Sequence, residues 1–128
     1  MARQPKENLY SSFRHAFEGL YYVIKEERNA RIHLLATILV VALGLWLHLS
    51  TIEWALIITA IALVFAGELL NTVTELTIDL ITLERLPLAK HAKDVAAGAV
   101  LVASLAAALL GFLILGPRLW AKLCTLWG

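Results

Sequence analysis

Three long apolar segments, separated by short polar stretches, dominate the hydrophobic pattern of this 128-residue chain. They cover residues 32–49, 54 to about 81, and 95–115, and the last is followed by the helix breakers Gly116-Pro117. A helix needs about 20 mostly apolar residues to cross the hydrocarbon of a bilayer. The pattern therefore predicts three membrane spans, over about residues 32–49, 54–81 and 90–115, with a helix end at Gly116-Pro117.

The segment before the first span has a different, amphipathic pattern. Apolar side chains recur at helical spacing, opposite a polar face that includes Arg14 and Glu18. The apolar positions are Tyr10, Phe13, Phe17, Leu20, Tyr21 and Ile24. We interpret this segment as a helix lying in the membrane interface, and the alternative is a helix packed on the bundle. The sequence thus predicts an all-α integral membrane protein with three transmembrane helices preceded by an amphipathic interfacial helix. Residues 1–30 form a cytosolic tail and surface helix, and residues 31–128 form one three-span membrane domain.

Composition supports the membrane class and excludes others. Hydrophobic residues make up 60% of the chain and charged residues 16%, which is too apolar for a soluble domain of this length. A net charge of +1 provides no broad basic surface, so we expect no nucleic-acid partner. The single cysteine, Cys124, cannot form an internal disulfide. The N-terminus carries charges throughout and does not resemble a signal peptide, so the first span should be retained.

The distribution of lysine and arginine predicts the orientation. Six of these residues precede the first span, three lie between the second and third spans, two follow the third span, and none separates the first two spans. Because cytosolic loops carry the excess of basic residues, we expect a multi-pass protein of the cell (inner) membrane with a cytosolic N-terminus. Trp46, Trp54 and Trp120 then fall at the opposite interface, where aromatic belts form.

Ionisable residues gather near the cytosolic ends of the predicted spans. Counted from Trp54 at 1.5 Å per residue, Glu68 lies roughly 21 Å into a hydrocarbon layer about 30 Å thick. A carboxylate at that depth costs several kcal/mol unless it is paired or neutralised, so Glu68 is the first candidate for a functional residue. The second span places Glu68, Asn71, Thr72, Glu75 and Asp79 on one face. Glu27 precedes the first span, and Lys93 with Asp94 opens the third.

This grouping favours magnesium and phosphate chemistry. Carboxylates beside an amide oxygen are hard ligands suited to Mg²⁺, which keeps several waters and bridges to nucleotide phosphates. Lys93 could meet a phosphate as a point charge. For each interfacial carboxylate alone, simple solvation is the competing interpretation. The chain contains neither a Walker A motif nor G-x-G-x-x-G, and we interpret His33 and His48 as interfacial or hydrogen-bonded residues.

Three motifs resemble the prokaryotic diacylglycerol and undecaprenol kinases, over about residues 13–117. They are Glu27-Arg28-Asn29, then Glu68-Leu-Leu-Asn71-Thr72 with Glu75 and Asp79, and Pro87-Leu-Ala-Lys90-His-Ala-Lys93-Asp94-Val-Ala-Ala-Gly98. Their order and spacing on a three-span chain of this size are specific. Val73-Thr74 departs from the family, which more often has alanine and an aliphatic residue there, and this puts two neighbouring contacts in doubt.

The resemblance implies a homotrimeric lipid kinase whose active sites lie between subunits at the cytosolic interface. Such an enzyme phosphorylates a membrane lipid alcohol with ATP and Mg²⁺. Carried over by motif position, Glu68 is the catalytic base and Glu27 and Glu75 hold Mg²⁺. Together with these two carboxylates, the residues expected to contact ATP are Asn71, Lys93 and Asp94.

The substrate and the function class each have an alternative. The motifs resemble the undecaprenol kinases more closely, so undecaprenol is the expected substrate and diacylglycerol, which would give phosphatidic acid, is the second. From a different class, the carboxylates could belong to a small ion or proton transporter, whose site would lie near the bilayer midplane between broken helices. A purely structural subunit would explain the spans but not Glu68. The small residues Ala99, Ala103, Ala107 and Gly111 form a ridge that permits close helix packing.

Overall fold

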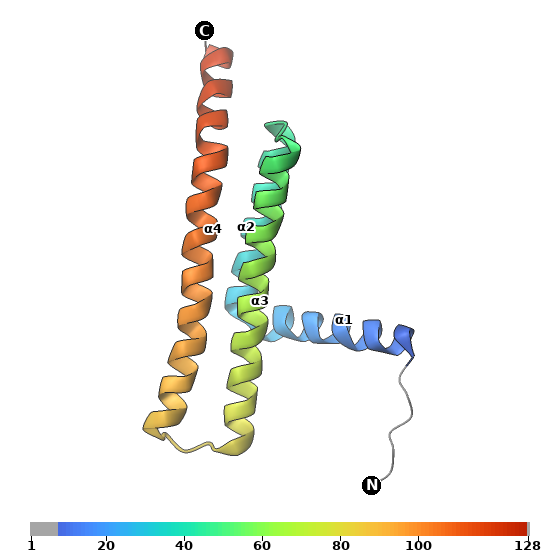
Figure 1. The fold of residues 1–128 in the computed structure, drawn as a ribbon, viewed down its shortest axis with the longest axis vertical. Helices are drawn as coiled ribbons and strands as arrows, with labels where there is room; N and C mark the ends of the chain where they lie inside the picture. The colour runs from blue at the N-terminus through green and yellow to red at the C-terminus, as the bar shows by residue number, and fades with distance from the viewer. Residues whose placement is uncertain (1–7, 128) are drawn as a thin grey trace.

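The computed structural model describes residues 8–127, and every regular element in that range is helical. The elements are α1 (Leu9–Glu26), α2 (Arg28–Trp46), α3 (Thr51–Ile81) and α4 (Pro87–Trp127). Helices α2, α3 and α4 run side by side as an elongated bundle, and α1 projects sideways from it (Figure 1). All three bundle helices are long and apolar enough to cross a membrane. The predicted all-helical, three-span fold is confirmed, while residues 1–7 of the expected tail lie outside the described residues.

Local capping explains where α1 and α3 begin. The Asn8 side chain accepts a hydrogen bond from the Ser11 N–H at 2.9 Å and starts α1. A capping box starts α3, because Ser50 Oγ accepts from the Glu53 N–H at 3.3 Å and Glu53 Oε2 accepts from the Ser50 N–H at 2.7 Å. Glu27 has extended backbone angles between α1 and α2. The chain therefore turns sharply at Glu27 and again before Ser50.

Helix α2 ends at Trp46, three residues before the predicted end of the first span. Leu47 and Leu49 are buried in the turn that follows, and His48 between them has a positive φ of 54°. These leucines continue the apolar run although they are no longer helical. Hydropathy could not detect this helix end, because the turn is itself part of the core.

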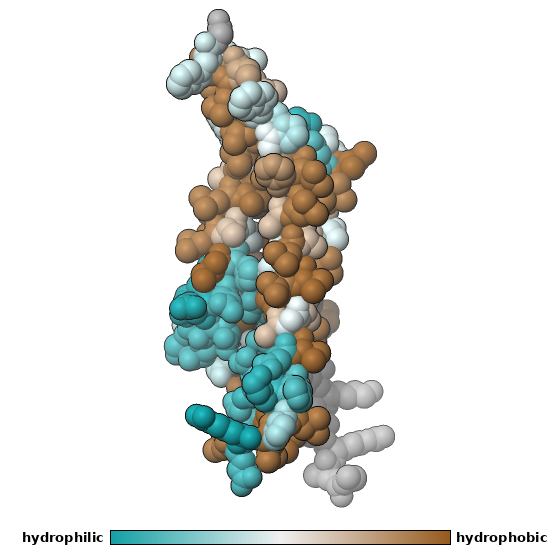
Figure 2. Space-filling view, turned by 90° about the vertical axis from the view of Figure 1, so that its left-hand side faces the viewer, coloured by the Kyte–Doolittle hydropathy of each residue, from teal (hydrophilic) through white to brown (hydrophobic). Residues whose placement is uncertain are grey.

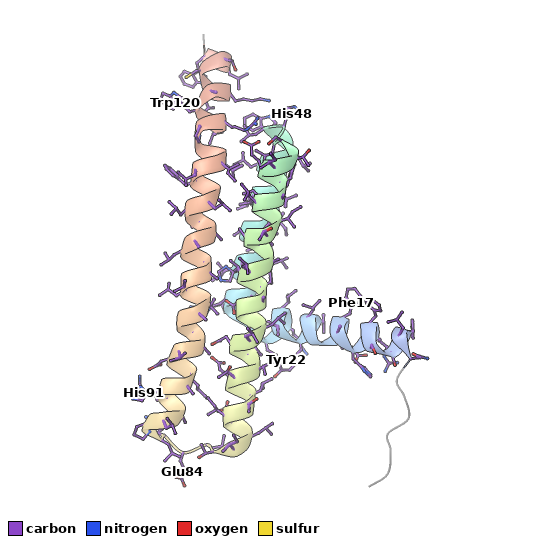
Figure 3. The ribbon with its side chains drawn as sticks, in the orientation of Figure 1. Phe17, Tyr22, His48, Glu84, His91 and Trp120 are labelled. Atoms are coloured by element: carbon purple, nitrogen blue, oxygen red, sulfur yellow. The ribbon has the colours of Figure 1, made fainter. Side chains whose placement is uncertain are left out.

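The apolar stripe of α1 lies outside the bundle. Val23 is the buried residue of this helix, whereas Phe13 is 59% exposed and Phe17 67% exposed, and Phe17 lies well away from the bundle in Figure 3. Residues of the 15–23 stretch of α1 line a groove with α3 residues of the 69–76 stretch. The alternative of a helix packed along the bundle is therefore wrong. Helix α1 projects sideways from the spans (Figure 1) and leaves its apolar stripe exposed, as suits a helix that lies in the membrane interface.

Helices α3 and α4 run antiparallel and are joined by an ion pair at each end. Lys93 Nζ donates to Asp79 Oδ1 at 2.6 Å, and Arg118 binds both carboxylate oxygens of Glu53 at 2.7 Å. Glu53 and Asp79 are separated by roughly 39 Å along α3, more than the hydrocarbon thickness of about 30 Å. Between the pairs, Gly67 of α3 faces Val100 of α4. The two ion pairs thus flank a mostly apolar stretch of helix contact that is long enough to cross the membrane and contains Glu68.

The predicted helix end at Gly116-Pro117 is wrong, because α4 continues through Pro117 to Trp127. A proline inside a helix removes one backbone hydrogen bond and costs about 3 kcal/mol. The continuation is tied down by tertiary contacts, since Arg118 pairs with Glu53. In addition, Lys122 Nζ donates to the Trp46 carbonyl at 3.1 Å and lies 5.0 Å from the centre of the Trp46 ring. These contacts hold the helix together past the proline.

The compact core lies at the end of the bundle where α2 meets α3. Its buried residues are Leu47, Leu49, Ile57 and Leu115. Trp120 and His48 lie at this same end, opposite Glu84 and His91 (Figure 3). Elsewhere large apolar side chains face outward, and Figure 2 shows them as a hydrophobic region above hydrophilic residues that gather in the lower half of that face. This surface needs lipid or further protein to cover it.

A glycine in this core makes the first testable prediction. A Cβ on Gly44 would lie 2.9 Å from Trp54 Cη2 and 3.0 Å from Leu49 Cδ1. Gly44→Ala should destabilise the protein by about 1–3 kcal/mol, because overpacking forces a bulky indole to move. The matched control is Gly19→Ala, where a Cβ meets nothing within 4 Å. Thermal unfolding in detergent should show a lower Tm for Gly44→Ala alone, and equal Tm values would contradict the packing.

Candidate active site

Glu68 is a nearly fully buried carboxylate at the point where the three bundle helices meet. Its side chain on α3 is 2% exposed. Oε1 lies 3.1 Å from Nε2 of His33 on α2, and the same nitrogen lies 3.5 Å from Oγ of Ser104 on α4. Oε1 accepts no hydrogen bond of regular geometry. We call His33, Glu68 and Ser104 the polar cluster.

The polar cluster forms part of the wall of an open groove of about 270 Å³. The groove is lined by Asn29 and His33 from α2, by Glu68 and Asn71 from α3, and by Ala97, Val100, Leu101 and Ser104 from α4. Glu68 is therefore shielded from bulk water yet borders a space that can admit a small group. This arrangement suits a base that must meet a hydroxyl at the edge of the hydrocarbon.

A second apolar groove of about 290 Å³ continues from the first, because both share His33 and Ser104. Small side chains from α4, Ala107, Ala108 and Gly111, line it opposite α2 and α3. The small-residue ridge predicted from the sequence thus contributes Ala107 and Gly111 to a groove. A Cβ on Gly111 would meet nothing within 4 Å, so this part of the ridge is open in the single chain.

Asn71 and Glu75 form a polar pair one turn beyond Glu68 on the same face of α3. Asn71 Nδ2 donates to Glu75 Oε1 at 3.2 Å, and the hydroxyl of Thr72 donates to the Glu68 carbonyl at 3.0 Å. Asn71 Oδ1 is buried and accepts no hydrogen bond. A buried amide oxygen without a donor is a costly feature, and it leaves a hard oxygen available to a ligand.

Lys93 and Asp94 lie in a different recess, of about 590 Å³, at the turn between α3 and α4. Lys93 pairs with Asp79, and Asp94 pairs with Lys90 one turn before it. Within one chain, the structure therefore divides the predicted site residues between the groove at Glu68 and this recess. Glu27, at the junction of α1 and α2, is not among the residues that line either space.

The predicted magnesium ligands do not form a complete metal cage. Among residues 8–127, no three His, Cys, Asp or Glu side chains are grouped so that they could hold an ion. Mg²⁺ that arrives with a nucleotide needs only one or two carboxylates, since waters and phosphates supply the rest. The partly buried Glu75 supplies one such carboxylate, and the neighbouring Asn71 Oδ1, which accepts no hydrogen bond, offers an additional oxygen. The residues present suit an ion shared with a nucleotide.

Comparison with known proteins identifies the family. The sequence model described as prokaryotic diacylglycerol kinase matches residues 14–115. The chain belongs to this family. It is 43% identical to the undecaprenol kinase of Bacillus subtilis (strain 168), over 91% of this chain and 95% of that protein. It is 42% identical to a diacylglycerol kinase of Synechocystis, over 92% of this chain and 68% of that protein. The diacylglycerol kinase of Pseudomonas aeruginosa is 34% identical, over 70% of this chain and 72% of that protein.

Family membership confirms the resemblance drawn from the three motifs, and it makes this protein a membrane lipid kinase. The family match covers α2, α3 and most of α4, including Glu68 and the pair formed by Asn71 and Glu75. The roles of the individual site residues stay predictions, and the geometry described above is what supports them.

Sequence reasoning missed the importance of His33. It treated this residue as interfacial or hydrogen-bonded and named no partner for it, whereas His33 faces the buried oxygen of Glu68. A usable signal was present, because polar residues inside spans tend to find one another. His33 from α2 and Ser104 from α4 are polar side chains that lie in this groove with Glu68. Their pairing could be found only once the relative heights of the helices were known.

Proposed function

We propose that this protein transfers the γ-phosphate of ATP to the hydroxyl of undecaprenol at the cytosolic face of the cell membrane. The observation that carries the proposal is the buried Glu68 at the wall of an open groove, in a chain of the prokaryotic diacylglycerol kinase family. The match to the relative named undecaprenol kinase covers 91% of this chain and 95% of that protein. Diacylglycerol is the second candidate, because other relatives are named for it.

In this proposal Glu68 accepts the proton of the lipid hydroxyl. The hydroxyl oxygen then forms a bond to the γ-phosphorus, and the bond from that phosphorus to the departing ADP breaks. Phosphoryl transfer depends mainly on positioning and on neutralising phosphate charge. The height of Glu68 suits the first step, because α1 lies beside residues 69–76 of α3. A lipid whose hydroxyl reaches Glu68 keeps its tail in the hydrocarbon.

The nucleotide lies on the cytosolic side of Glu68 in this proposal. Asn71 offers its free Oδ1 to it, and Lys93 supplies a positive charge to the phosphates once its pairing with Asp79 is exchanged. Asp94 contacts the nucleotide from the same turn of α4. Glu27 and Glu75 would hold the Mg²⁺ that accompanies ATP, and that ion would neutralise phosphate charge. Each of these residues acts by orienting or holding the nucleotide.

A homotrimer with sites between subunits completes the proposal. One chain leaves the recess at Lys93 and Asp94 separate from the groove at Glu68. A bundle of three helices also leaves large apolar side chains exposed, such as Leu39, 70% exposed, and Phe112, 74% exposed. Association of identical chains would cover part of this apolar surface. It would also allow residues of one chain to approach Glu68 of another.

The transporter alternative receives less support. Transporter sites lie near the midplane and use discontinuous helices. Helix α3 is unbroken over its 31 residues, and Glu68 directly precedes the 69–76 stretch of α3 beside which α1 lies. The position of Glu68 therefore favours chemistry at one face of the membrane.

The direct test of function is phosphate transfer by purified protein in mixed micelles. With ATP labelled in the γ-phosphate, label should enter undecaprenol, and transfer to diacylglycerol in a parallel reaction should be slower. Faster transfer to diacylglycerol would make diacylglycerol the preferred substrate and undecaprenol the second candidate. Absence of transfer to either lipid, with intact folded protein, would contradict the kinase proposal.

The orientation provides a second prediction, independent of activity. In a Cys124→Ser background, Thr51→Cys should react with a membrane-impermeant thiol reagent added to intact cells, because Thr51 is exposed at the start of α3, whereas the proposed nucleotide site lies toward the other end of that helix. Arg85→Cys, exposed in the turn between α3 and α4, is the matched control and should react only after the cells are opened. The reverse labelling would place Lys93 and Asp94 outside, away from cytosolic ATP.

A further inference from the structure

His33 occupies a position that its sequence context does not explain. It lies on α2 with its ring 22% exposed, and its Nε2 atom is within 3.1 Å of Glu68 Oε1 and 3.5 Å of Ser104 Oγ. His33 also lines both the groove at Glu68 and the apolar groove that continues from it. The two grooves thus meet at His33 and Ser104.

The geometry distinguishes the two oxygens of Glu68. Oε1 is enclosed and faces His33, so a substrate cannot reach that oxygen without displacing the imidazole. A proton on Nε2 would be shared with Oε1 and would hold the carboxylate in one orientation. The second oxygen, Oε2, then remains for the lipid hydroxyl. Without the imidazole, the carboxylate would be free to rotate in a space lined by Val100 and Leu101.

We propose that His33 is a positioning residue for the lipid kinase reaction, which holds Glu68 through Oε1 so that Oε2 faces the lipid hydroxyl. The inference rests on the proposed function, because it assigns Glu68 the role of base. Ser104 Oγ on α4 lies 3.5 Å from the same Nε2 atom and, with Nε2 protonated, can only accept a share of that N–H. His33 itself touches neither ATP nor the reacting atoms. Its effect reaches the reaction only through the orientation of one carboxylate.

The consequence for kinetics is specific. A base displaced by about 1 Å can cost on the order of 10²-fold in rate, while nucleotide binding lies elsewhere. His33→Leu should therefore lower kcat by roughly 10- to 100-fold and leave KM for ATP within about twofold of the unaltered value. His33→Gln keeps a polar N–H donor of similar reach and should recover a large part of kcat. A general loss of structure would not be repaired selectively by glutamine.

The matched control is His48, the next histidine along the chain after His33. His48 lies exposed in the turn after α2, at the far end of the bundle, and has a positive φ. His48→Asn preserves a residue that tolerates this backbone conformation. It should leave kcat, KM for ATP and Tm unchanged, whereas His33→Leu should change kcat.

The decisive experiment is a double-mutant cycle measured with ATP and undecaprenol. If His33 acts through Glu68, adding His33→Leu to Glu68→Gln should cause no further loss of kcat beyond that of Glu68→Gln alone. Losses that multiply would show that His33 acts independently and would overturn the proposal. A His33→Leu variant with normal kcat would also overturn it, while leaving the kinase function intact.

Two further outcomes separate the possible failures. If the unaltered protein phosphorylates neither undecaprenol nor diacylglycerol, the proposed function itself fails and the role of His33 falls with it. If His33→Leu does not fold, the comparison of His33→Gln with His33→Asn decides, since asparagine is too short to reach Oε1. Recovery by glutamine and not by asparagine supports the positioning role, and equal activity of the two contradicts it.

Discussion

Replacing Glu68 with glutamine should lower kcat by about 10²- to 10⁴-fold, the range that a general base contributes to proton transfer. Glutamine keeps the shape of the side chain but cannot accept the hydroxyl proton. Because Glu68 lies on the lipid side of the proposed nucleotide position, ATP binding should remain close to normal. Purified protein assayed with labelled ATP and undecaprenol measures the first quantity, and equilibrium nucleotide binding measures the second.

The same substitution has an expected effect on stability that helps to interpret it. Glu68 is 2% exposed among apolar helices, and a buried carboxylate is costly even when a polar group lies nearby. Glu68→Gln should therefore fold at least as well as the unaltered protein. The control is Glu18→Gln, which alters an exposed carboxylate on α1 and should leave kcat unchanged. Normal turnover by Glu68→Gln would remove this residue from the mechanism.

Removing a proposed magnesium ligand should produce a different kinetic signature. Glu75→Ala and Glu27→Ala should each raise the Mg²⁺ concentration needed for half-maximal activity by about tenfold or more, because each deletes one hard oxygen ligand. Titrating Mg²⁺ at fixed ATP measures the shift, and saturating Mg²⁺ should restore part of the lost rate. Glu18→Gln again serves as the control. An unchanged Mg²⁺ dependence in either variant would show that its carboxylate is not a ligand.

Glu75 has a second role that the Mg²⁺ titration can distinguish. Its Oε1 accepts from Asn71 Nδ2 at 3.2 Å, so Glu75→Ala also releases the Asn71 amide. Glu75→Gln can keep that contact while losing the negative charge. If the charge matters for the ion, alanine and glutamine should raise the Mg²⁺ requirement to a similar extent. If the contact with Asn71 matters instead, glutamine should restore normal behaviour.

Local sequence determined the class of the protein and the approximate position of its helices, but not where α2 and α4 end. Apolar length depends on the chain alone, because any helix that crosses a bilayer must satisfy its backbone internally and cover about 30 Å. The second span was expected to end at about Ile81, and α3 ends there. The amphipathic stripe before the first span likewise predicted α1. Glu68 could be recognised from the sequence as a candidate functional residue, because burying a carboxylate within a span is costly however the helices pack.

Only the tertiary structure decided which polar groups meet. His33 and Ser104 meet Glu68 because of the positions of α2 and α4 along the bundle axis relative to α3. The spacing of residues within a single helix cannot predict these relative positions. The same relative heights pair Lys93 with Asp79 and so place it in a recess apart from Glu68. Helix α4 passes Pro117 because Arg118 finds Glu53 on another helix. Local preference sets where helices form, whereas contacts between distant segments depend on how whole helices pack, and that packing determines the chemistry available at Glu68.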